Sequence, residues 1–121
     1  MPFSDELQRV VALTGSTYSV RAIEHRTLFT NRGGGALTLT LPAIADVQAG
    51  WWIEVFLVAA GDHVLTAPTD KLTTYNDATA TSYTIGTDNE EIGHGYKVIF
   101  DGTTYLLMIY LPSETATNTV A

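Results

Sequence analysis

The chain has 121 residues, of which 16% are charged, with a formal net charge of −7 and no cysteine. Its six lysines and arginines are scattered, so no basic patch is available to bind nucleic-acid phosphates or an anionic membrane surface. Disulfides and thiolate metal sites are excluded. No apolar run approaches the roughly 20 residues that cross a bilayer, and the first residues lack the basic and apolar regions of a secretory signal. We expect a single soluble domain that binds neither nucleic acid nor membrane.

Residues 4–13 are the one segment with helical signals. Ser4 can cap a helix, two acidic residues follow it, and Gly15 lies beyond its end. A terminal arm or a strand fits so short a segment nearly as well. We therefore expect residues 1–17 to form an N-terminal arm with a possible short helix.

From Tyr18 onward the sequence predicts strands, because runs of β-branched and aromatic residues alternate with Gly, Asn, Asp and Pro. The expected strands cover residues 18–23, 26–30, 36–41, 51–59, 63–66, 82–85, 95–100 and 104–111. Asp101-Gly102 between two apolar runs predicts a hairpin whose loop takes two or three residues. Many short strands with regular turn signals are typical of an all-β sandwich or barrel.

The fold expected from this pattern is all-β, a small antiparallel β-sandwich or barrel of β-tulip-like form. A single β domain would cover residues 18–111, and residues 112–121 would form a C-terminal tail.

Residues 51–59 are apolar on both faces when read as a strand, whereas a small antiparallel domain normally buries one face only. One face holds Trp51, Ile53, Val55 and Leu57, and the other holds Trp52, Glu54, Phe56 and Val58. Burial of both inside a closed barrel is one interpretation. We favour an interface between chains, because large exposed apolar patches are rare on monomers. We expect the Trp51 face to be the core, although the pattern also permits the reverse assignment.

Motifs for chemistry are absent. His25, His63 and His94 are the only histidines, and no metal-ligand spacing joins them or the acidic residues beside them; we expect solvated loop or strand-edge histidines. Residues 88–91 lack the pattern of a calcium loop, and Gly33-Gly34-Gly35 lacks the Lys-Ser/Thr of a phosphate loop. Paired carboxylates of a glycosidase type would meet only in the fold. We expect no enzyme, with no catalytic residue, no cofactor and no metal.

Three segments, taken in order, resemble a β module of tailed-bacteriophage structural proteins. They are Thr40-Leu41-Pro42, the apolar strand from Trp51 to Val58, and Asp101-Gly102-Thr103 followed by Tyr105. The module is common in capsid decoration (cement) proteins and in fibre or spike domains, and the resemblance covers about two thirds of the chain. It implies a trimeric β-sandwich or barrel on a virion. The lack of repeats, heptads or a collagen-like stalk favours a decoration protein over a fibre.

We therefore predict a virion structural protein, a capsid decoration protein that stabilises a phage head from its outer surface. Its partners would be itself, as a homotrimer, and the major capsid protein, and it would be made in the host cytoplasm. The alternative is a tail-fibre or spike module whose loops at 67–81 and 86–94 recognise a receptor or glycan. The residues expected at the oligomer or capsid interface are Trp52, Phe56, Val58, Leu106, Met108, Tyr110, Phe3, Leu7 and Val10.

Overall fold

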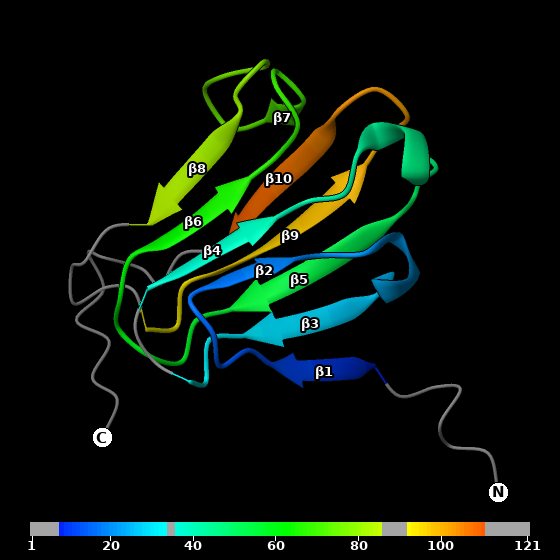
Figure 1. Cartoon of the computed structure of the whole chain (residues 1–121). Coiled ribbons are helices and arrows are strands. Elements are labelled where there is room, and N and C mark those ends of the chain that lie inside the picture. Colours follow the sequence, from blue (N-terminus) through cyan, green and yellow to red (C-terminus); the bar gives the residue numbers. More distant parts are fainter. Residues whose placement is uncertain (1–7, 34–35, 86–91, 111–121) are drawn as a thin grey trace, which may run out of the picture.

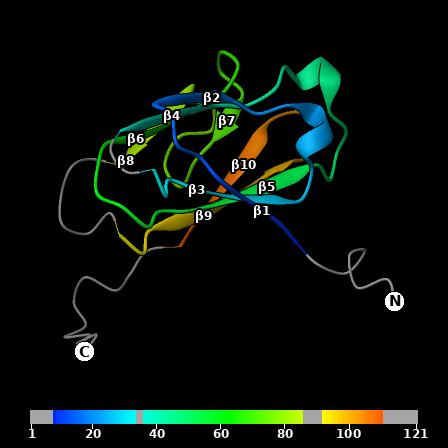
Figure 2. The same ribbon diagram turned by 60° about the horizontal axis from the view of Figure 1, so that its bottom comes forward.

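The computed structural model describes residues 8–33, 36–85 and 92–110. These residues form two β-sheets that lie one over the other, with short turns at their ends (Figures 1 and 2). The six-stranded sheet has the order β1 (Arg9–Ala12), β3 (Thr27–Thr30), β5 (Trp52–Phe56), β9 (Gly95–Phe100), β10 (Tyr105–Tyr110) and β7 (Leu72–Thr73). The four-stranded sheet has the order β2 (Thr17–Ser19), β4 (Leu37–Thr40), β6 (His63–Thr66) and β8 (Ser82–Ile85). Two single-turn 3-10 helices, η1 (Ala22–Glu24) and η2 (Ile44–Asp46), lie between strands.

The chain alternates between the two sheets from β1 to β9. The chain leaves a sheet, forms one strand in the other sheet and then returns. Its next strand in the first sheet therefore runs in the same direction as its previous strand there, and the two pair in parallel when they are neighbours. Among the described residues, five strand pairings are parallel and three are antiparallel. The predicted all-β content is confirmed. The predicted antiparallel arrangement is wrong, and so is the closed barrel, because both sheets are open.

The predicted strands at 63–66, 82–85 and 95–100 have the observed bounds, and most others are trimmed at their ends. The segment 18–23 divides between β2 and η1. The possible helix over 4–13 is not formed in its described part, where the alternative of a strand is found: Arg9–Ala12 pairs in parallel with β3. Two adjacent valines favour a strand here once an edge is available to pair with. Strand β7 is an addition, and the predicted tail at 112–121 lies outside the described residues.

The inner surfaces of both sheets form one hydrophobic core. On β5 and its flanks, Trp51, Ile53, Val55 and Leu57 are all buried, so the predicted core face is confirmed and the reverse assignment is excluded. The facing sheet contributes alternate residues, among them Leu39 and Leu65, which lie side by side on β4 and β6. Period-two alternation thus places one face of every central strand inside.

The hairpin between β9 and β10 has a loop of four residues, 101–104, rather than two or three, because Phe100 and Tyr105 are the last paired residues. The Asp101 carboxylate accepts hydrogen bonds from the backbone N–H groups of Thr103 and Thr104, both at 2.8 Å. Gly102 takes φ +99°, a left-handed conformation that favours glycine. This loop sets the register that turns Tyr105 into the core.

Tyr105 joins the two sheets at this end of the sandwich. Its hydroxyl donates to the carbonyl oxygen of Pro42, just beyond β4, at 2.8 Å. Its ring lies edge-on to Trp51, with centroids 5.9 Å apart, and 5.1 Å from the ring of Phe100. Trp51 in turn donates from Nε1 to the Ala22 carbonyl in η1, at 2.9 Å. The three segments that carry the phage-module resemblance therefore meet at one structural joint.

We predict that Tyr105→Phe lowers the free energy of unfolding by about 1–3 kcal/mol, because the buried Pro42 carbonyl loses its donor. Tyr110→Phe is the matched control: its side chain is 49% exposed, and its effect should stay within about 0.5 kcal/mol. Urea denaturation of both variants measures the difference. Equal stabilities for the two variants would contradict a joining role for Tyr105.

Candidate functional site

The outer surface of the six-stranded sheet is the most distinctive surface of the molecule, because it is largely apolar. Phe56, Met108 and Tyr110 are between 41% and 49% exposed, and Val10 is 61% exposed. Trp52, Leu106, Leu28 and Ile99 are half-buried on the same side. We call this surface the apolar face, made of Val10, Leu28, Trp52, Phe56, Ile99, Leu106, Met108 and Tyr110.

Strand register arranges the apolar face in cross-strand rows. One row runs Trp52, Ile99, Leu106, and another runs Phe56, Gly95, Tyr110. At Gly95 an added Cβ would lie 2.7 Å from the Val55 carbonyl oxygen and 3.6 Å from the Phe56 ring. Only glycine fits there, and its bare backbone leaves the Phe56 ring in contact with β9.

Most of the residues predicted for an interface do come together. Trp52, Phe56, Leu106, Met108 and Tyr110 share the apolar face. Val10 joins them, because β1 is the edge strand next to β3, whereas the sequence placed it on a separate arm. Leu28 and Ile99 were missed. Their outward direction follows from alternation with the buried neighbours Phe29 and Val98, a signal that the sequence did carry.

Val58 lies beyond the end of β5, in a loop. Its backbone N–H donates to Oδ1 of buried Asn31 at 2.7 Å, and the Asn31 side chain also bonds both backbone groups of Ala59. These bonds hold the chain where it leaves the sheet, so Val58 is placed by a loop contact rather than by the strand. Phe3 and Leu7 lie outside the described residues.

The outer surface of the four-stranded sheet has the opposite character. Its outward positions are almost all hydroxyl-bearing. They are Thr17 and Ser19 on β2, Thr38 and Thr40 on β4, Val64 and Thr66 on β6, and Ser82 and Thr84 on β8. Threonine and serine can bond water from a strand surface. We call this surface the hydroxyl face. The sandwich therefore has one apolar outer surface and one outer surface rich in hydroxyl-bearing side chains.

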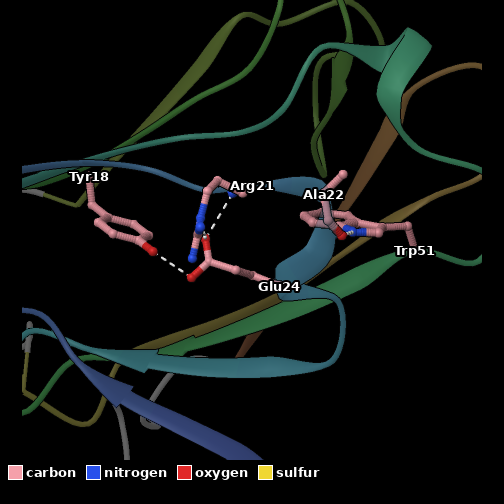
Figure 3. A network of polar contacts seen from close by, with 5 residues as sticks. All are labelled: Tyr18, Arg21, Ala22, Glu24 and Trp51. Carbon is pink, nitrogen blue, oxygen red and sulfur yellow. Dashed lines mark hydrogen bonds and ion pairs between the residues drawn. The ribbon is translucent and has the colours of Figure 1, made fainter.

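A buried carboxylate lies inside the fold beside η1. Glu24, only 1% exposed, accepts hydrogen bonds from the Tyr18 hydroxyl and from the Arg21 backbone N–H, the latter at 2.8 Å (Figure 3). The Arg21 Nε lies 3.6 Å from it. Burial raises the pKa of Glu24, but the Tyr18 and Arg21 contacts outweigh burial and hold the pKa below its usual value. Because all its contacts hold β2 to η1, the network is structural.

The histidines are less exposed than predicted. His25 is exposed, but His63 is fully buried and His94 is 8% exposed, so solvated positions are wrong for two of them. Nε2 of His63 and the Tyr96 hydroxyl share a hydrogen bond of 2.6 Å between the two sheets. The pKa of His63 is lowered to about 4, chiefly by burial and to a smaller extent by the nearby His94, while the Leu37 backbone acts in the opposite sense.

The remaining candidates offer little chemistry. Among residues 8–33, 36–85 and 92–110, no three His, Asp or Glu side chains are grouped so as to hold a metal ion. The acidic segment 88–91 lies outside them. A cavity of about 400 Å³ is lined by His25, Trp51 and the loop 46–50. In the described part of the chain, no helix has the length and apolar character to cross a membrane.

No protein-family model matches the chain, and a search of curated proteins finds no match.

We predict that acid destabilises the protein through His63. Its folded-state pKa of about 4 lies below the ordinary value of 6.5, so the folded state favours neutral His63. That contribution is complete above pH 6.5 and is lost as the pH falls toward 4. The loss should reach about 3 kcal/mol, at about 1.4 kcal/mol per pKa unit.

Urea denaturation at several pH values measures this slope. His63→Gln, which can still bond Tyr96 but does not titrate, should reduce the slope by most of that amount. His25→Gln should reduce the slope much less, because His25 lies at an exposed position where burial and the neighbouring Arg26 also lower its pKa, but by less than for His63. The same slope in native protein and His63→Gln would assign the acid sensitivity to other groups.

Proposed function

We propose that the chain is a virion structural protein: a capsid decoration protein that self-associates, as a homotrimer, and binds the major capsid protein on the outer surface of a phage head. The observation that carries this proposal is the apolar face. It holds eight apolar side chains on five adjacent strands, a surface that a monomer rarely exposes to water.

The contrast between the two outer surfaces supports an assembly with a defined orientation. Aromatic residues and Met are enriched at the centres of protein interfaces, and here they gather on the apolar face. The hydroxyl face suits contact with water. In the proposed assembly the apolar faces meet, and the hydroxyl faces point away from the seam.

The resemblance to phage structural modules supplies the virion part of the proposal. Its three segments meet at the joint formed by Pro42, Trp51 and Tyr105, so the residues that carry the resemblance also contact one another in the fold. Attachment to a shell through three chains would let weak single contacts give stable binding.

A tail-fibre or spike module is the second candidate function, and the cavity beside Trp51 favours it. Its lining combines an aromatic ring with the polar side chains of His25, Asp46 and Gln48. Small-ligand sites typically combine apolar walls with a few polar groups in this manner. A glycan contact there would differ from the predicted loops 67–81 and 86–94.

We predict that Phe56→Asp and Met108→Asp each convert the native oligomer to a folded monomer, because a carboxylate on the apolar face would be buried in the seam. Thr84→Asp, an exposed position on the hydroxyl face, is the matched control and should keep the oligomer. Light scattering gives the mass, and circular dichroism checks the fold. A native chain that is monomeric at micromolar concentration would overturn the proposal.

The virion role has its own measurement, which is binding to undecorated capsid shells of the phage that encodes the chain. A decoration protein should saturate the shell in many copies, whereas a fibre is present in few. Binding to a glycan array together with no binding to shells would replace the first candidate with the second.

A further inference from the structure

The apolar face carries two opposite charges in its middle row. Glu54 on β5 and Lys97 on β9 are directly paired residues, flanked by Leu28 and Met108. When a partner covers the centre of an apolar surface, a charge there loses its hydration, and this desolvation opposes binding. This row therefore decides which kind of surface can dock here.

Within the chain, each of these charges is held by a neutral group. The Glu54 carboxylate accepts a hydrogen bond from the Gln8 side-chain amide at 2.9 Å. The Lys97 ammonium lies 4.4 Å from the centroid of a Trp52 ring. In the part of the chain that the structure describes, the one ion pair is Arg21–Glu24. A carboxylate accepts several hydrogen bonds and an ammonium donates three, so both groups retain capacity for a charged partner.

A second copy of this chain can supply an opposite charge to both Glu54 and Lys97, which an apolar partner or a partner of one sign cannot. A wholly apolar partner would desolvate both charges without compensation. A partner of one sign would attract one group and repel the other. A copy of the same face presents an ammonium and a carboxylate in the same arrangement. The charges are therefore complementary to themselves.

We propose, on the basis of the self-association proposed above, that Glu54 of one copy pairs with Lys97 of the neighbouring copy and thereby sets the register of the seam. In a two-fold assembly the pair occurs twice across the axis. In a three-fold assembly Glu54 of each copy pairs with one neighbour and Lys97 pairs with the other neighbour, so that three pairs form a closed ring. A shifted register would cover both charges with the apolar rows on either side of them, without an opposite charge.

Charge reversal tests the pairing. Glu54→Lys alone and Lys97→Glu alone should each raise the dissociation constant by at least about tenfold, and the double variant should return it to within about threefold of the native value. Asp62→Lys and Lys71→Glu change the net charge equally, and neither residue belongs to the apolar face: Asp62 lies in the loop before β6, and Lys71 precedes β7 at the edge of the sheet. Both substitutions should leave the constant unchanged. Sedimentation equilibrium measures all of these.

Mixing the two single variants separates pairing between copies from pairing within one chain. Each mixed junction would join opposite charges, so in a two-fold assembly the mixture should form dimers that contain both chains, as native mass spectrometry of the two masses would detect. A ring of three must keep one junction between identical chains, so a three-fold assembly should recover only in part. Where a reversal prevents folding, Glu54→Gln, Lys97→Gln and their combination replace it. Their double-mutant cycle should show a coupling of at least about threefold in the dissociation constant.

The outcomes distinguish this inference from the proposal beneath it. A native oligomer that Phe56→Asp dissociates, but that both reversals leave intact, would overturn the pairing and keep self-association. The pairing also falls if neither the double variant nor the mixture recovers assembly. A monomeric native chain would overturn self-association itself.

Discussion

The fold depends on a small number of buried links between its two sheets, and the most consequential is the hydrogen bond from the Tyr105 hydroxyl to the Pro42 carbonyl. Pro42 lies two residues beyond the end of β4 and Tyr105 begins β10, so this contact fixes one end of the sandwich. The His63–Tyr96 bond makes a second link between the sheets. A buried polar group must be satisfied, so each link specifies where one sheet lies on the other, while the apolar core supplies most of the stabilisation.

The alternating path of the chain explains what sequence reasoning could and could not foresee. Alternation of apolar and polar residues locates a strand and its buried face, so the inward direction of Ile53 and Val55 was predictable. Side chains alternate between the two faces of a strand in parallel and antiparallel sheets alike, so the direction of each strand was not predictable from alternation. Direction follows from the connections, several of which cross to the other sheet. Strand β7, with only two residues, carries too little pattern to be recognised.

The candidate site was predictable to the extent that it lies on strands with strong alternation. The outward residues of β5 and β10 were identified from the sequence because both strands are apolar on two sides. Their union in one surface required β9 between them, and that order is a property of the topology. Val10 shows the opposite case, because its segment begins with helix-capping residues and becomes a strand through pairing with β3. Local preference is weak when an unpaired sheet edge is available.

Glu54 and Lys97 give the apolar face two different properties in the proposed assembly. In the free chain they are half-buried charges in the middle of the face, and the cost of removing their hydration would limit indiscriminate apolar association before assembly. In the assembled state the same groups would be covered, and their desolvation would be offset only in the one arrangement that joins opposite charges. The apolar residues would then supply the affinity and the central row the specificity. A face that was apolar throughout would associate in many registers, whereas a defined assembly requires one.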